Sequence, residues 1–196
     1  MKKTIIIIVA IVAVVLIGVF WSFSIQNNAV VKDENVTEAW ANVETSYQRR
    51  NDLIGNLVKT VQGAADFERK TLTDVIEARA KATSVNIDAS NITPESIQQF
   101  QQAQSGVSSA LSRLLVSVER YPELKANQNF LKLQDELTST ENTIMTARTR
   151  YNAAVKDFNI YIQKMPNKFF LSGYEKKPSY KADEGADKAK EVEFNF

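Results

Sequence analysis

Hydrophobic residues in this chain form one unbroken apolar run, followed by several shorter stripes. The run extends from Thr4 to Ile25 without a charged residue and follows the basic pair Lys2 and Lys3. About 20 apolar residues are needed for a helix to cross a bilayer, and aromatic side chains favour the headgroup region at its end. A cleaved signal peptide fits less well, because its apolar core has only about 7–15 residues and a small-residue cleavage site follows it. We therefore predict a retained transmembrane anchor over residues 1–27. The residues that define it are Ile5, Ile8, Val12, Leu16, Phe20 and Trp21.

Beyond the anchor, apolar residues recur at alternating spacings of three and four, which indicates amphipathic helices. The first stripe runs from Val36 to Val61, with Arg50 in place of one apolar residue, and ends near Gly63. The next apolar set has a different phase, which predicts a turn near Gly63 and a second helix over about 66–82. The acidic residues Asp66 and Glu68 would then lie in its first turn, where they are favourable.

Two further helices follow a polar loop at residues 84–93. Thr93, Pro94 and Glu95 form a helix-start signal, with Thr as N-cap and Pro in the first turn. The third helix ends at Tyr121, because a residue before proline disfavours the helical region. The fourth keeps heptad spacing over about 123–164, roughly 60 Å at 1.5 Å per residue, and Pro166 stops it.

Short connections between amphipathic helices favour antiparallel neighbours. The sequence therefore predicts an all-α fold, with an up-and-down antiparallel four-helix bundle over residues 28–166. The alternative is a three-helix bundle in which the first two helices are continuous through Gly63. Residues 167–196 form a partly flexible tail. Its aromatic part, 168–180, either packs back onto the bundle or meets the bilayer surface. Its last five residues, 192–196, alternate apolar with polar, as in a short docking strand or a frayed terminus.

Composition narrows the chemistry that the chain can perform. It contains no Cys and no His, and its net charge is +1. Disulfides, thiolate zinc sites, cysteine nucleophiles and the Glu-x-x-His pairs of di-iron bundles are therefore excluded, as is the side chain best suited to proton transfer near neutral pH. The balanced charge gives no electrostatic case for nucleic acid. We predict no catalytic activity, no cofactor or metal and no small-molecule substrate.

Charge also predicts the orientation of the anchor. Lys2 and Lys3 precede it, and no positive cluster follows it. The positive-inside rule places the N-terminus in the cytoplasm and the bundle outside the cytoplasmic membrane. The opposite orientation is the alternative.

Three segments together resemble the LemA family. They are YQRRNDLIGNLVKTVQG at 47–63, LSRLLVSVERYPELKANQNFLKLQDELTSTEN at 111–142 and ARTRYNAAVKDFN at 147–159. The resemblance implies a helical bundle behind a membrane anchor, without an established catalytic activity, in proteins that are commonly encoded near membrane proteases. Gly55 departs from the family pattern, which usually has proline there. Both residues weaken a helix locally.

Conspicuous polar residues form three candidate sites, each with a structural alternative. The first, in the first helix, is a site for a partner or an anion, or an internal ion pair of Arg50 with Glu141 or Glu119. We favour the ion pair, because an unpaired buried charge is very costly. Its residues are Arg49, Arg50, Asp52 and Asn56.

The second candidate is the turn into the fourth helix, which is either turn chemistry or a recognition corner. Its residues are Glu119, Tyr121, Pro122, Lys125 and Asn127. The third is a face of the fourth helix with Arg148, Asn152 and Asn159. The two asparagines are seven apart, so they share a face. They could hydrogen-bond across the bundle or to a partner helix. The structural alternative, which we favour, is a solvated face with contacts inside the bundle.

These features lead to a functional hypothesis. The chain is interpreted as a membrane-anchored helical scaffold or interaction protein of the bacterial cell envelope, whose partners are the lipid bilayer and either further copies of itself or another envelope protein. The alternative is an adaptor or regulator of a membrane protease or other envelope enzyme.

Overall fold

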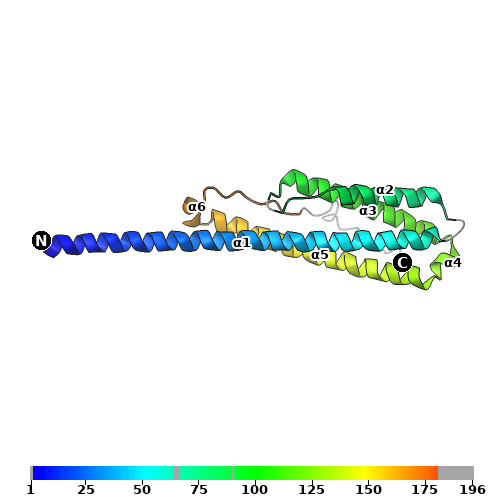
Figure 1. Cartoon of the computed structure of the whole chain (residues 1–196), viewed down its shortest axis with the longest axis horizontal. Helices are drawn as coiled ribbons and strands as arrows, with labels where there is room; N and C mark the ends of the chain where they lie inside the picture. The colour runs from blue at the N-terminus through cyan, green and yellow to red at the C-terminus, as the bar shows by residue number, and fades with distance from the viewer. Residues whose placement is uncertain (1, 64–66, 90, 181–196) are drawn as a thin grey trace, which may run out of the picture.

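The computed structural model describes residues 2–63, 67–89 and 91–180, and within these ranges all regular structure is helical. Figure 1 shows a rod that leads into an elongated bundle of helices. The helices are α1 (Lys2–Gln62), α2 (Arg69–Ser84), α3 (Pro94–Val118), α4 (Pro122–Lys125), α5 (Gln128–Gln163) and α6 (Asn167–Phe170).

The predicted anchor and the first bundle helix are one uninterrupted helix. Residues 26–35, which join them, contain neither glycine nor proline, so nothing in the local sequence interrupts α1. The N-terminal part of α1 is long and apolar enough to cross a membrane. Its side chains are exposed as far as Trp21, whereas Ile25 and Ala29 are buried. The core therefore begins about three turns before Val36, where the hydrophobic stripe first becomes regular.

Four long helices form the bundle, as predicted, and the three-helix alternative is wrong. α1 ends at Gln62 and α2 begins at Arg69. Asp66, predicted in the first turn of α2, lies outside the described residues. Glu68 occupies the N-cap position but makes no capping hydrogen bond with its side chain. Its carboxylate instead accepts from Arg120 at 3.3 Å, which joins the start of α2 to the end of α3.

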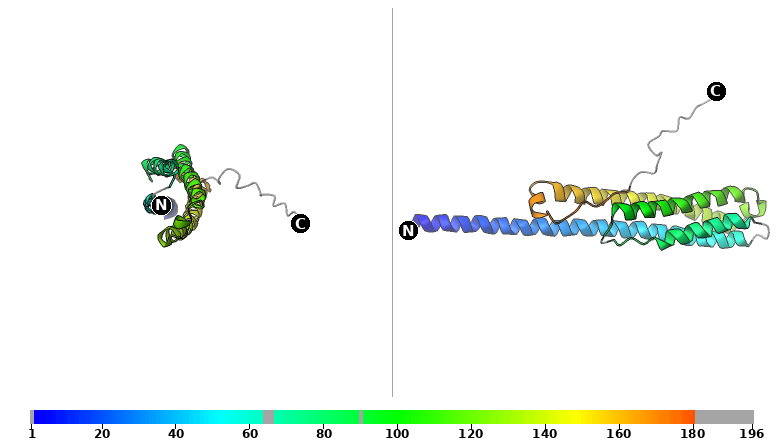
Figure 2. Two further views of the ribbon diagram at one scale, coloured as in Figure 1. Left: turned by 90° about the vertical axis from the view of Figure 1, so that its right-hand side faces the viewer. Right: turned by 90° about the horizontal axis from the view of Figure 1, so that it is seen from above.

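The bundle is built from two antiparallel helix pairs of unequal length. α1 packs along α5, and α2 packs on α3. Figure 2 shows that α2 and α3 cover only the half of the bundle that is distant from the apolar rod. In the half next to the rod, the pair of α1 and α5 is completed by α6 and the segment that follows it (Figures 1 and 2).

Side-chain caps set the starts of α3 and α5. Thr93 and Ser96 form a capping box, in which the Thr93 Oγ1 accepts from the Ser96 N–H at 3.1 Å and the Ser96 Oγ accepts from the Thr93 N–H at 3.0 Å. This matches the predicted start of α3. The predicted fourth helix, by contrast, is interrupted. Asn127 leaves the helical region and its Oδ1 accepts from the N–H groups of Asn129 at 2.9 Å and Phe130 at 3.2 Å. An asparagine competes with the helix in this way because its side chain can bond nearby backbone groups, so one turn, α4, precedes α5.

The hydrophobic core consists of two clusters, one on each side of Arg50. The cluster nearer the rod is rich in large aromatic residues, including Trp40, Phe100 and Phe158. The distal cluster is mostly aliphatic. Each large side chain buried in this way contributes about 1.5–3 kcal/mol. The heptad stripes thus account for the core, and the polar substitution at position 50 divides it.

Candidate functional site

Arg50 lies inside the bundle and is only 2% exposed. It occupies a core position of the α1 stripe, so its side chain must point toward α3 and α5. One terminal nitrogen donates to Glu141 Oε1 at 3.0 Å and to Ser108 Oγ at 3.1 Å. The other donates to the backbone oxygen of Gln104 at 3.3 Å and to the amide Oε1 of the same residue. The planar fork of arginine suits several acceptors at once.

This arrangement is an internal polar layer, defined here as Arg50, Gln104, Ser108 and Glu141. The layer opens to solvent on one side, because the Glu141 side chain is 48% exposed. On the other side the guanidinium lies 4.8 Å from the ring centre of Tyr47, a cation–π contact. Glu119, the other predicted partner, pairs with Lys125 instead. Since the guanidinium is enclosed and both of its terminal nitrogens donate to oxygens of the same chain, the layer offers no open site for an external anion.

The other residues of the first candidate cluster point outward. Arg49, Asp52 and Asn56 are exposed, and Asp52 lies 4.0 Å from Arg79 of α2. The Arg79 Nε also donates to the Asn51 backbone oxygen at 2.8 Å. Sequence reasoning did not select Arg79 as a site residue, since nothing local indicates that it reaches across to α1.

Gly55 explains why Arg79 can approach α1 so closely. A Cβ at position 55 would lie 3.3 Å from the Arg79 Cζ, tighter than ordinary van der Waals contact. The glycine therefore leaves room for the guanidinium on the surface of α1. Around this contact α1 and α2 form a shallow hollow lined by Asp52, Gly55, Asn56 and Arg79, among others.

Asn152 and Asn159 bind a segment of the same chain. We call residues Leu171–Tyr180 the strap. The Asn159 amide donates to the Lys177 oxygen at 2.8 Å and accepts from the Lys177 N–H at 2.9 Å. The Asn152 amide donates to the Tyr180 oxygen at 3.2 Å and accepts from the Tyr180 N–H at 2.8 Å.

The spacing of these contacts explains how they form. Seven residues of helix rise about 10.5 Å, and three extended residues span about 10 Å. The strap therefore runs antiparallel to α5, with Lys177 and Tyr180 in register with the two asparagines. The hydrogen bonds of this face are therefore made within the chain, to the extended backbone of the tail rather than to another bundle helix.

Tyr180 fits into an aromatic socket on the bundle. Its ring stacks on Trp40 with centroids 6.0 Å apart and meets Tyr151 edge to face at 5.9 Å. The Arg148 guanidinium lies 4.8 Å from its ring centre. The Tyr151 hydroxyl donates to the Pro178 oxygen at 2.8 Å. Burial raises the pKa of both Tyr180 and Tyr151 well above the usual 10.0. Within the aromatic part of the tail, Tyr180 thus belongs to the core, whereas Phe169 and Phe170 are exposed. The predicted docking strand, 192–196, lies outside the described residues.

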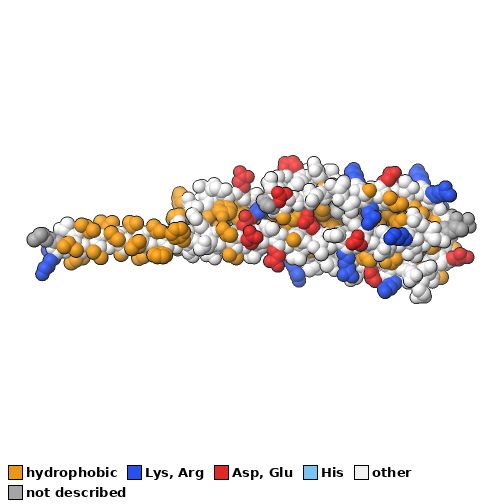
Figure 3. Space-filling model, in the orientation of Figure 1, with side chains coloured by type: hydrophobic (Ala, Val, Ile, Leu, Met, Phe, Trp, Pro, Cys, Tyr) orange, Lys and Arg blue, Asp and Glu red, His pale blue; other side chains and the backbone are white. Residues whose placement is uncertain are grey.

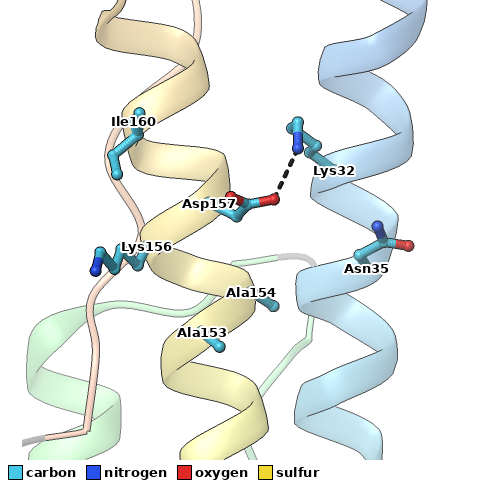
Figure 4. A pocket seen from close by; sticks show the side chains of 7 residues that line it. All are labelled: Lys32, Asn35, Ala153, Ala154, Lys156, Asp157 and Ile160. Atoms are coloured by element: carbon cyan, nitrogen blue, oxygen red, sulfur yellow. Dashed lines mark hydrogen bonds and ion pairs between the residues drawn. The ribbon is translucent and has the colours of Figure 1, made fainter.

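An ion pair crosses a shallow groove between α1 and α5 (Figure 4). The Lys32 Nζ lies 2.8 Å from the Asp157 Oδ2. Ala153 and Ala154 lie on its α5 side, while Lys156 and Ile160 point away from α1 (Figure 4). Without convergent polar groups, the groove lacks the features of a small-molecule site.

The turn between α3 and α5 is held by contacts within itself and by a ring contact with Phe67, which precedes α2. Tyr121 packs its ring against Phe67 with centroids 4.9 Å apart, and Pro122 starts α4. Lys125 pairs with Glu119, and Asn127 caps α5. Each of these residues therefore has a structural role in the turn, by packing, starting a helix, pairing charges or capping.

Across residues 2–63, 67–89 and 91–180, no group of three or more acidic side chains is placed to hold a metal ion. The polar side chains of Arg50, Asn152 and Asn159 bind other parts of the chain. Fold and site together define a class: an elongated helical bundle continuous with an apolar N-terminal helix.

Comparison with known proteins identifies the family. The LemA family profile matches residues 39–196, so the chain belongs to the LemA family. Two proteins named magnetosome protein MamQ 1 and MamQ 2, from Paramagnetospirillum magneticum, are each 27% identical over 76% of this chain and 62% of their own length. A protein named LemA from Metamycoplasma hominis is 23% identical over 73% of this chain and 63% of its own length. The chain therefore spans less than two-thirds of the length of these relatives.

Proposed function

We propose that the protein is a membrane-anchored, non-catalytic scaffold of the cell envelope, which binds further copies of itself or another envelope protein through its helix faces. The observation that carries this proposal is the continuity of α1. Its exposed apolar half has the length and composition of a membrane span, and its other half packs against both α2 and α5. The bundle is therefore held rigidly by its own anchor.

The most conspicuous polar side chains contact the bundle itself, which supports a function that is exerted through the outer surfaces of the helices. Arg50, Asn152 and Asn159 contact other parts of the chain, so these groups maintain the bundle. What remains for a partner is the outer surface of the long helices. Two large apolar side chains stand out there, Val116 on α3, 72% exposed, and Met145 on α5, 63% exposed.

The absence of cysteine makes the proposal directly testable. Single cysteines at Met145 and Val116 of the full chain, crosslinked in native membranes and identified by mass spectrometry, should give defined adducts. Self-adducts would support a scaffold, and one dominant heterologous adduct would support an adaptor. Monomeric protein at both positions, together with a monomeric mass in detergent, would refute the interaction role.

The same variants test the orientation. We expect Met145→Cys to react with a membrane-impermeant maleimide on intact cells, since the positive-inside rule places the bundle outside the cytoplasm. Reaction only after the membrane is opened would reverse the topology.

A further inference from the structure

Met165 and the short helix α6, which begins just after Pro166, present large apolar side chains to solvent at one end of the bundle. Phe169 is 75% exposed, Met165 59% and Phe170 40%. The lysines Lys164 and Lys168 are exposed beside them. Two basic residues next to three large apolar ones match the composition of segments that lie in a membrane interface.

Contacts with α1 place this group at a definite height along the anchor. The rings of Phe170 and Trp21 meet edge to face with centroids 6.5 Å apart. The Tyr161 hydroxyl donates to the Ile25 backbone oxygen at 3.1 Å. α6 therefore lies beside the end of the apolar run, as Figure 1 shows, and Figure 3 shows hydrophobic side chains continuing from the rod onto this end of the bundle.

That height corresponds to the headgroup region of a bilayer. A hydrocarbon core of about 30 Å is spanned by about 20 helical residues, which from Ile5 extends to Ser24. Trp21 lies in the last turn of this span, and aromatic residues there favour the interface. A side chain that touches Trp21 from outside α1 must lie at nearly the same depth.

We propose that the turn Met165–Phe170 is a second membrane contact, which inserts Phe169 and its neighbours into the headgroup region of the bilayer that α1 crosses, with Lys164 and Lys168 facing lipid phosphates. This inference rests on the proposed membrane anchoring. Its occupant is lipid, because the apolar surface is continuous with that of the anchor. A second contact point next to the first fixes the base of the bundle against the membrane surface.

Spin labels on single cysteines in the full chain, reconstituted in phosphatidylcholine–phosphatidylglycerol vesicles, test the proposal. Labels at Phe169→Cys, at Phe20→Cys as the membrane reference and at Met145→Cys as the exposed control would be compared. Collision rates with oxygen and with a water-soluble nickel chelate distinguish lipid, water and protein surroundings. All three sites are highly exposed on the protein, so labelling should leave the fold intact, which circular dichroism would verify.

We expect the nickel accessibility at position 169 to be severalfold lower than at 145, with oxygen accessibility approaching that at position 20. High nickel accessibility at 169, with position 20 shielded, would overturn the second contact and leave the anchor standing. Low accessibility to both reagents at 169 would instead assign the patch to a protein contact and also overturn the proposal. High nickel accessibility at position 20 would refute the membrane anchor itself, and the second contact with it.

Discussion

Replacing Arg50 by methionine tests how the internal polar layer stabilises the bundle. The alternatives are the hydrogen bonds that Arg50 donates to buried acceptors and the positive charge of its guanidinium. Methionine keeps the unbranched shape and fills most of the volume, but it removes every donor of the guanidinium. Of the groups left behind, the carboxylate of Glu141 is half exposed and can turn to water. Gln104 is 4% exposed, so its amide oxygen loses its donor inside the core. An orphaned buried acceptor costs about 1–3 kcal/mol, which is the loss expected for Arg50→Met.

The second part of this prediction concerns the double variant Arg50→Met/Gln104→Leu. Replacing both partners of a buried polar contact by apolar side chains of similar size is often nearly neutral. We expect the double variant to lie within about 1 kcal/mol of the parent, although Gln104→Leu alone leaves a buried cation short of an acceptor and also costs about 1–3 kcal/mol. Glu141→Gln, which keeps an acceptor at a half-exposed position, should cost less than about 1 kcal/mol.

The assay is thermal and denaturant unfolding of the full chain in detergent, followed by helical circular dichroism. For a chain of 150–250 residues, each kcal/mol corresponds to a fall in Tm of about 2–4 °C. The reasoning would be refuted if the double variant lost as much as the two single variants added together, because the two side chains would then act independently.

Three further predictions concern the strap, the buried tyrosines and a helix cap. Asn152→Ala removes both hydrogen bonds to the Tyr180 backbone. Hydrogen exchange at the Tyr180 backbone amide should accelerate by about one order of magnitude, for an expected loss of about 1–2 kcal/mol. Asn142→Ala, at an exposed position of the same helix, should leave this exchange rate unchanged. Burial raises the pKa of Tyr180 in the folded protein above its usual 10.0, so the free energy of unfolding should keep its full value below pH 10 and fall as the pH rises above it. In a pH series of unfolding curves, Tyr180→Phe should reduce this fall. An unchanged dependence of stability on pH would contradict the burial of the Tyr180 hydroxyl as its cause. Thr93→Ala should lower stability by about 1 kcal/mol through loss of the cap on α3, measured against Thr138→Ala, a helix-interior site that is exposed.

The hydrophobic pattern predicts the anchor and the four long helices because each is a property of a single segment. An apolar run or a 3-4 stripe can be recognised without knowing its neighbours, and the start of α3 depends on residues within one turn. The break at Asn127 was missed because the apolar stripe of this helix begins only at Phe130, so its spacing says nothing about the residues between Pro122 and Asn127.

The residues of the candidate site were easier to recognise than their partners. Arg50 stands out as the charged residue of an apolar stripe, but whether Glu119 or Glu141 approaches it depends on the relative axial position of α1 and α5, which no local pattern contains. Asn152 and Asn159 were recognised as sharing a face. Their partner, extended backbone of the strap, has no sequence signature, because main-chain groups are the same at every residue. Tyr180 was likewise assigned to a tail, since its socket combines residues from α1 and α5.

Because α1 is uninterrupted, a tilt of its apolar part also moves the far end of the bundle. From Ser24 to Gln62 the helix rises about 57 Å at 1.5 Å per residue, so the end of the bundle that carries the α3–α5 turn stands that far from the membrane surface when the helix is upright. A tilt of about 20°, the average for membrane helices, displaces that end sideways by about 20 Å. A change in bilayer thickness that alters the tilt of α1 within the membrane is therefore amplified at the distal end of the bundle, where the turn around Pro122 lies.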